Sequence, residues 1–238
     1  MLESPDMDYQ MNDNKKMPPL SNPTEVPLPK YPIYTVEYFQ KYFDVTSDDV
    51  IERIKGALIP KFGVNYLQQH IRAKPDVYGP FWICLTLVFS IAISGNVANY
   101  IQVAADNKYH WKYNFHAVSS AATAIFVYAW LLPLVLWAFV KYKEPQFNLS
   151  YLELLCLYGY SLSIFIPISI LWVIQINWLQ WLLVATGTLL SGYVIVSSII
   201  PSLGQKPFAF IFLIIILHLF MGTGFMLHFF HVPPLQKN

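Results

Sequence analysis

Long apolar runs dominate the last two thirds of the chain, and short polar breaks separate each run from the next. A helix that crosses the hydrocarbon core of a bilayer needs about 20 predominantly apolar residues, at a rise of about 1.5 Å per residue. Five runs reach this length. They predict five transmembrane helices, at about residues 81–103, 117–140, 151–174, 178–200 and 208–230.

The first third of the chain is polar and divides into two segments of different character. Residues 1–32 are rich in Pro, Asn, Asp and Lys, a composition typical of a disordered tail. Residues 33–77 instead carry aromatic and aliphatic residues three and four apart, which predicts two short amphipathic helices. Thr46 and Asp49 form a variant capping box that starts the second helix.

Two short helices cannot bury both of their faces by themselves. We therefore expect them to dock on the membrane domain, to lie in the bilayer interface, or to bind a partner protein. The apolar residues predicted as a cytosolic partner contact are Val36, Phe39, Phe43, Val50 and Ile54. The charged residues expected to face water on the second helix are Glu52, Arg53 and Lys55.

Composition supports a membrane protein. Hydrophobic residues make up 55% of the chain and charged residues only 12%, whereas soluble domains carry about 25% charged residues. The net charge of +1 gives no field that would attract nucleic acid. We predict an all-α membrane protein with a partly disordered cytosolic N-terminal region. Its parts are a tail (1–32), an amphipathic helical segment (33–77), a five-helix domain (78–231) and a lumenal tail (232–238).

Lys and Arg near the ends of the spans predict the orientation. With a cytosolic N-terminus, more of these cations lie on the cytosolic side than on the other. The cytosolic set is Lys61, Arg72, Lys74, Lys141, Lys143 and Lys206, and the opposite set is Lys108, Lys112 and Lys237. The C-terminus is then lumenal, and the glycosylation sequon at Asn148 faces the cytosol and stays unmodified.

Ionisable groups are scarce in the spans. Glu153 lies one turn from the cytosolic end of the third span, and His218 and His228 lie in the fifth. The two histidines are about 15 Å apart along one helix, too far to share a metal ion. His228 and His231 are three residues apart near the lumenal end and could share an ion or a headgroup, but we expect the histidines simply to be interfacial. We predict that Cys84 and Cys156 are small apolar residues packed in the bundle. The sequence also lacks catalytic and nucleotide-binding motifs, so we predict no enzyme, metal or cofactor.

Small residues and prolines shape the spans. Gly95, Gly187 and Ser191 permit close approach of helices, either within the bundle or between chains. Pro133 and Pro167 fall inside the second and third spans and should kink them, because each removes a backbone hydrogen bond.

Two local motifs remain. In Asp76-Val77-Tyr78-Gly79-Pro80, before the first span, Pro80 suits the first helical turn and Asp76 can cap the helix end. In Tyr158-Gly159-Tyr160, inside the third span, each buried tyrosine hydroxyl should find a partner, and Asp76 or the entry of the first span is a candidate. On this hypothesis Tyr158→Phe lowers stability.

Together these motifs resemble the two signatures of the Yip family, the Rab-interacting membrane proteins of the Golgi and ER. Val77 stands where the family usually has Leu. Residues 31–60 resemble the cytosolic stretch of a Golgi-resident subgroup. The signature residues that carry over are Asp76, Tyr78, Gly79, Pro80, Tyr158, Gly159 and Tyr160.

The resemblance implies a non-enzymatic protein of vesicle-mediated transport, in the Golgi membrane or the late endosome. Its implied partners are Rab-type small GTPases and other Yip-family proteins. Two alternatives come from other classes of protein. A small polytopic transporter or channel would have the kinked second and third spans line a path. An intramembrane enzyme would use Glu153, His218 or His228.

Overall fold

The computed structural model describes residues 35–40, 42–105, 115–143, 147–203 and 208–229. The predicted tails at 1–32 and 232–238 lie outside these residues, as do Lys108, Lys112 and Lys206. The chain divides into two compact units, Met1–Tyr38 and Phe39–Asn238. Apart from the first residues of the short helix Val36–Gln40, the features described below belong to the second unit. The described residues form helices, and no strand occurs among them.

The five predicted spans are confirmed as five helical segments long and apolar enough to cross a membrane. Their helices, in chain order, are α3 (Tyr78–Ala105); α4, η2 and α5 (His116–Phe126, Val127–Leu131 and Leu132–Lys143); α6, η3 and α7 (Tyr151–Ser161, Leu162–Ile164 and Phe165–Leu171); α8 and η4 (Asn177–Ile199 and Ile200–Ser202); and α9 and η5 (Phe208–Gly224 and Phe225–Phe229). We call these segments spans one to five.

The helix type changes just before each of the two prolines that were predicted to kink the spans. The π-helix η2 precedes Pro133, and the 3₁₀ turn η3 precedes Pro167. A proline removes the hydrogen bond to the carbonyl four residues earlier and its ring crowds that carbonyl. The carbonyls concerned belong to Ala129 and Ser163, and each lies inside the altered turn. The changes in helix type therefore follow from the two prolines.

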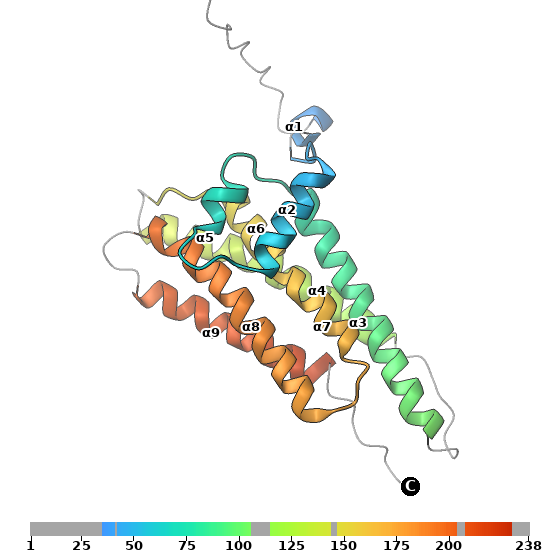
Figure 1. The fold of residues 1–238 in the computed structure, drawn as a ribbon. Coiled ribbons are helices and arrows are strands. Elements are labelled where there is room, and N and C mark those ends of the chain that lie inside the picture. The colour runs from blue at the N-terminus through green and yellow to red at the C-terminus, as the bar shows by residue number, and fades with distance from the viewer. Residues whose placement is uncertain (1–34, 41, 106–114, 144–146, 204–207, 230–238) are drawn as a thin grey trace, which may run out of the picture. The chain divides into compact units, whose positions relative to one another are not determined.

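Span three forms the centre of the bundle. Of its most apolar stretch 72% is buried, against at most 44% for the other spans. Helix α6 packs against α3, α5 and α8, and α9 packs against α8. Spans one, three and five begin at the end of the bundle where α2 lies, and spans two and four begin at the other end (Figure 1). We call these the proximal and distal ends.

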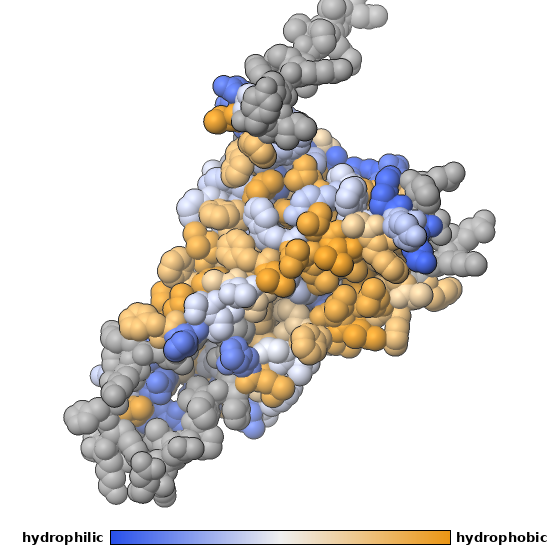
Figure 2. All heavy atoms as spheres, turned by 180° about the vertical axis from the view of Figure 1, so that it is seen from behind, coloured by the Kyte–Doolittle hydropathy of each residue, from blue (hydrophilic) through white to orange (hydrophobic). Residues whose placement is uncertain are grey.

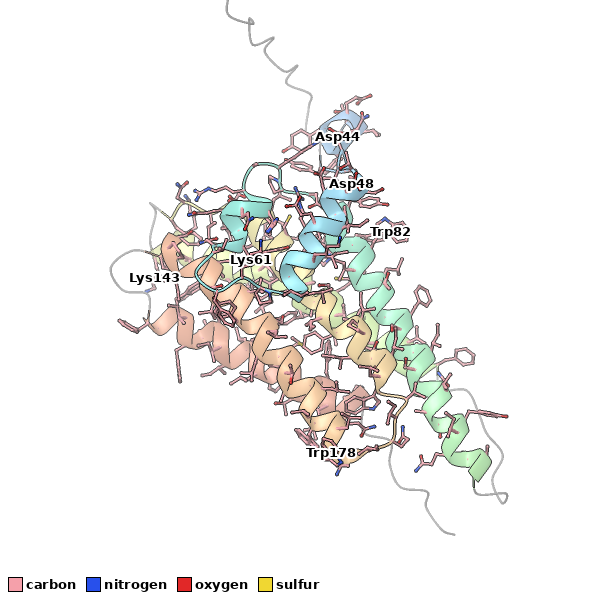
Figure 3. All side chains as sticks on the ribbon, viewed as in Figure 1. Asp44, Asp48, Lys61, Trp82, Lys143 and Trp178 are labelled. Atoms are coloured by element: carbon pink, nitrogen blue, oxygen red, sulfur yellow. The ribbon has the colours of Figure 1, made fainter. Side chains whose placement is uncertain are left out.

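The surface has the polarity of a membrane domain. Hydrophobic side chains cover the middle of the face in Figure 2, and hydrophilic ones gather toward its ends. Figure 3 shows Asp48, Lys61 and Lys143 at the proximal end and Trp178 at the distal end. Trp82 projects from the first turns of span one and is half exposed. Tryptophan at these levels is typical of the headgroup region.

The proximal end carries the helices that precede span one. Helix α2 (Ser47–Leu58) begins with the predicted capping box, in which Thr46 and Asp49 exchange hydrogen bonds of 3.1 and 3.2 Å. These bonds lower the pKa of the Asp49 carboxyl. A short π-helix, η1 (Leu67–Ile71), follows α2 and packs against α6.

The first amphipathic helix is shorter than predicted. It is α1 (Val36–Gln40), and the aromatic residues after it form a turn. In that turn Phe43 N–H donates to the Gln40 carbonyl and Val45 N–H donates to the Phe43 carbonyl. The helical spacing of the aromatic residues therefore continues past the end of the helix itself.

Candidate functional site

The carboxylate of Asp76 is the centre of a buried polar cluster at the proximal end. The residue has no exposed surface, and its side chain contacts residues of α2, the start of α3, and α6. Its Oδ2 accepts a hydrogen bond of 2.7 Å from the Gly79 N–H, so it caps the first turn of span one as predicted. The Tyr160 hydroxyl lies 3.1 and 3.0 Å from its two oxygens. Arg53 of α2 completes the set with an ion pair to Oδ1.

Arg53 ties α2 to the segment that leads into span one. Its second guanidinium nitrogen donates to the Lys74 carbonyl at 2.7 Å, and the guanidinium lies 6.0 Å from the centroid of the Tyr160 ring. Burial by itself lowers the pKa of Arg53, but Asp76 and Tyr160 raise it, and the net pKa lies above its ordinary value. Arg53 is therefore a buried cation paired with a buried carboxylate.

The backbone of Asp76 is also held by span three. Its N–H donates to Cys156 Sγ at 3.2 Å, and the Cys156 thiol donates to its carbonyl at 2.7 Å. The Tyr66 hydroxyl donates to the Arg53 carbonyl at 2.9 Å. Burial raises the pKa of Tyr66 well above its ordinary value, so this phenol remains a neutral donor. Side chains and backbone from four elements thus converge on one charge pair.

The glycines of the two motifs let the helices interlock. A Cβ added to Gly79 would lie 1.9 Å from the Tyr160 hydroxyl oxygen. A Cβ added to Gly159 would lie 2.4 Å from Pro80 Cβ and 2.9 Å from Pro80 Cα. All three distances are far below van der Waals contact. The two sequence motifs are therefore the two halves of one contact between spans one and three.

The other two aromatic signature residues lie outside the polar cluster. Tyr158 is buried against Tyr128 of span two, with ring centroids 5.4 Å apart. Its hydroxyl has no hydrogen-bond partner within the described part of the chain. The hypothesis that Asp76 pairs with a motif tyrosine is thus correct for Tyr160 and wrong for Tyr158. Tyr78 is partly exposed, and its ring lies beside that of Trp82.

Two members of the cluster were missed by sequence reasoning. Arg53 was expected to face water, yet it is buried, and Cys156 was expected to be a plain packing residue. A signal for Arg53 is its position on α2, because Val50, Arg53, Ile54 and Ala57 follow the spacing of one helical face. No comparable sequence signal marks Cys156, whose role depends on the approach of a segment 80 residues away.

The residues predicted to contact a cytosolic partner differ in exposure. Val36 is highly exposed, and Phe39 and Phe43 are half exposed. Val50 and Ile54 instead pack, half buried, against the core of the bundle. Helix α2 therefore uses part of its apolar face for intramolecular docking.

The predicted packing residues occupy different surroundings. A Cβ on Gly187 would lie 2.4 Å from Ile168 Cδ1, so this glycine sets the approach of spans three and four. Ser191 is fully buried, and its hydroxyl is unpaired among the described residues. Gly95 has no atom of the described chain within 4 Å of its Cβ position.

The ionisable residues of the spans lie at three different levels. Glu153 caps the proximal end of α6 together with Ser150, whose N–H donates to the carboxylate at 2.7 Å. His218 is buried, not interfacial: it pairs with the Tyr128 hydroxyl, and its Nε2 lies 3.0 Å from the Thr188 carbonyl. His228 lies toward the distal end. The Glu153, His218 and His228 side chains therefore do not come together in one site.

The geometry of the Asp76 cluster is that of a clamp. Its charges pair with each other, its donors are occupied, and Asp76 itself is sealed from solvent. Buried ion pairs are expensive to leave half made, so the cluster favours one arrangement of α2 against spans one and three. We call these residues (Arg53, Asp76, Gly79, Cys156 and Tyr160) the proximal clamp.

Comparison with known proteins gives a consistent picture. The chain matches the Yip1 domain over residues 58–227. It is 36% identical over 177 residues to Protein YIPF1 homolog of Dictyostelium discoideum, covering 74% of this chain and 49% of that protein. It is 27% identical over 199 residues to Protein YIP5 of Schizosaccharomyces pombe, covering 79% and 78% of the two chains. The chain thus spans about half the length of the first relative. No solved structure matches it significantly.

Proposed function

Because the chain belongs to the Yip1 domain family of membrane-trafficking proteins, we propose that it is a non-enzymatic protein of vesicle-mediated transport. It acts in the Golgi membrane or the late endosome, with the N-terminus cytosolic and the C-terminus lumenal. Its partners are Rab-type small GTPases and other Yip-family proteins.

Exposed apolar side chains at the proximal end are the observation that carries the proposal. Ile59 and Phe62 are 77% and 82% exposed, and Phe43 and Ile51 are about half exposed. All four lie outside the five spans. Apolar side chains outside the spans are typical of a surface that a protein or the bilayer interface covers. We call Phe43, Ile51, Ile59 and Phe62 the proximal apolar residues.

A cavity lined in part by Ile59 offers a place for a partner's side chain. It measures about 470 Å³ and lies between the end of α2, η1 and the proximal part of α8. Ile59, Val64 and Tyr193 contribute apolar surface to it, and Lys55 and His70 contribute polar groups. Interfaces concentrate their binding energy where an anchor side chain fills such a pocket within a polar rim.

The proximal clamp makes this surface suitable for recognition. Arg53 and Asp76 fix α2 on the bundle, so its outer residues are presented in one arrangement before a partner arrives. Preorganisation lowers the ordering cost of binding. A GTPase on the cytosolic side would therefore meet a formed surface.

Recovery of GTPases from solubilised membranes tests the partner proposal. The full chain, tagged at the N-terminus, would be captured with a panel of prenylated Rab-type GTPases in their GTP-bound and GDP-bound forms. We expect Ile59→Ser/Phe62→Ser to lower recovery of the bound GTPase at least fivefold. Tyr142→Ser is the matched control, because Tyr142 is equally exposed at the proximal end of span two. If Ile59→Ser/Phe62→Ser and Tyr142→Ser recover the same amount of GTPase, the proximal apolar residues are not the contact.

Steady-state location tests the trafficking role itself. The tagged chain, expressed from its own promoter, would be compared with markers of the Golgi, ER, endosome and plasma membrane. Golgi or late endosomal signal supports the proposal. A plasma-membrane or mitochondrial signal would contradict it and favour the transporter or channel alternative.

A further inference from the structure

A groove of about 820 Å³ opens between spans two and five, and none of its lining belongs to the proximal clamp. We call it the lateral groove. On one side it is walled by α4 and η2, and on the other by α9 and η5. Both walls belong to spans, so the groove lies at the depth of the bilayer. The solvent it meets there is lipid.

Polar side chains gather at one end of the groove. His116, Ser119 and Thr123 line it in the first two turns of α4, and His228 lines it near the end of η5. Span two begins and span five ends at the distal end of the bundle. The polar end of the groove therefore lies where the headgroups of the distal leaflet would be.

The rest of the lining is apolar apart from Tyr128, whose hydroxyl pairs with His218. Val127 and Leu132 continue the wall on span two, and Leu217 and Phe220 continue it on span five. From His228 to Leu217 the helix rises roughly 16 Å. Half of the bilayer's hydrocarbon thickness is about 15 Å. The apolar stretch thus has the depth of one leaflet.

The hydroxyls at the polar end have a defined hydrogen-bonding direction. Ser119 and Ser120 donate to the His116 carbonyl, and Thr123 donates to the Ser119 carbonyl at 2.9 Å. A hydroxyl that donates to its own helix keeps lone pairs that can accept. Imidazole nitrogens can donate to phosphate oxygens. The polar end therefore suits a headgroup with a phosphate and with N–H or O–H donors.

A transmembrane helix of a partner fits the lateral groove less well. Such a helix would be apolar at this depth and would leave the hydroxyls and imidazoles at the polar end of the groove without a partner. An amphiphile with a polar head and a long apolar chain matches both parts of the lining.

We propose that the lateral groove binds one glycerophospholipid of the distal leaflet. One acyl chain lies along Val127, Leu217 and Phe220, and the headgroup lies at His116 and Ser119. The headgroup is of the ethanolamine type, because its ammonium N–H groups can donate to the hydroxyls and a choline headgroup has none.

Native mass spectrometry of the full chain in mild detergent tests the proposal. Phosphatidylethanolamine and phosphatidylcholine of matched chain length would each be titrated into delipidated protein. We expect one ethanolamine lipid to bind per chain, at least fivefold tighter than the choline lipid. Ala124→Trp fills the groove and should lower binding at least fivefold. Val135→Trp is the control, because Val135 is more than half exposed on α5 and is not part of the lining.

A second variant keeps the test decisive if the tryptophan disturbs folding. Ser119→Ala/Thr123→Ala removes hydrogen-bond acceptors without adding volume, and it should erase the preference for ethanolamine while leaving an acyl chain bound. Equal binding by wild type, Ala124→Trp and Val135→Trp would overturn the proposal. So would a wild-type dimer that Ala124→Trp converts to a monomer, since a second chain would then occupy the groove.

Discussion

At the scale of single residues, the most informative feature is a charge pair buried where the polar segment meets the bundle. Asp76 is fully buried and Arg53 nearly so. Burying two charges carries a desolvation cost that their attraction offsets only when the remaining polar atoms are also satisfied. Here Gly79, Tyr160 and the Lys74 carbonyl satisfy them. The pair therefore specifies where α2 sits more than it adds net stability.

Removing one partner of this pair should be much worse than removing both. Asp76→Ala leaves the Arg53 cation buried and unpaired, at a cost of roughly 3–5 kcal/mol. Arg53→Met/Asp76→Ala removes both charges and should be less destabilising than either Asp76→Ala or Arg53→Met alone. Thermal unfolding in detergent, followed by size-exclusion recovery, measures the three variants. Additive losses would mean that the two residues are not coupled.

The two motif tyrosines give a matched comparison. Tyr160→Phe removes a donor to a buried carboxylate, and bonds to charged groups are worth about 1.5–3 kcal/mol. Tyr158→Phe removes a hydroxyl without a partner among the described residues, so its effect should be close to zero. The same unfolding assay compares them. A larger loss for Tyr158→Phe would restore the hypothesis drawn from the sequence and contradict the geometry.

At the scale of the elements, the helices were predictable and their mutual rotation was not. Length and apolarity predicted the five spans, because lipid imposes both. The prolines predicted disturbed helix geometry in spans two and three, and the helix type changes just before each of them. The choice between Tyr158 and Tyr160 was open, however, because two residues differ by about 200° around a helix. Only the packing of span one against span three decides which of them meets Asp76.

The burial of Arg53 shows the limit of reading one helix alone. Its charge predicts water, although its position on α2 predicts the buried face. The position of Arg53 on α2 decides the outcome, because a buried acceptor, Asp76, lies outside α2. Asp76 lies 23 residues further along the chain, so the hydrophobic periodicity within α2 cannot indicate that Arg53 has this partner.

The approach of spans one and three should depend on glycine at two positions. In Gly79→Ala and Gly159→Ala the new methyl groups would collide with Tyr160 and with the backbone of Pro80. Overpacking of this kind costs about 1–3 kcal/mol. Gly95→Ala is the matched control on the same span, since its Cβ position is open in the described structure. Thermal stability in detergent should therefore fall for the first two variants and not for the third.

The contact between α2 and η1 should weaken in mild acid. Burial lowers the pKa of His70, although Glu52, 3.6 Å away, opposes the shift. Because the folded pKa lies below the unfolded value of about 6.5, the unfolded chain binds more protons. Stability therefore falls as the pH drops from about 6.5 toward the folded pKa. Hydrogen exchange of α2 at pH 7.5 and 5.5 measures this, and His70→Gln should reduce the pH dependence. An unchanged pH dependence in His70→Gln would exclude this histidine as the cause.

At the scale of the whole molecule, the placement of Lys and Arg in the described part of the chain bears on the orientation of the membrane domain. The described Lys and Arg side chains near the ends of the spans lie at the proximal end: Lys61, Arg72, Lys74, Lys141 and Lys143. The proximal end also carries α2 and the clamp. Cytosolic loops carry the excess of such cations in membrane proteins, which favours a cytosolic proximal end.

Glycosylation gives the direct test of this orientation. We expect the native sequon at Asn148, just before α6 at the proximal end, to remain unmodified. A sequon placed in an extension after Asn238 should be glycosylated. The reason is that an odd number of spans puts the N-terminal and C-terminal flanks of the membrane domain on opposite sides of the bilayer. A sequon placed among residues 1–30 serves as the control and should stay unmodified. The readout is the mobility shift that an endoglycosidase reverses. Glycan on the N-terminal sequon alone would invert the orientation, and with it the side from which a GTPase could reach the proximal apolar residues.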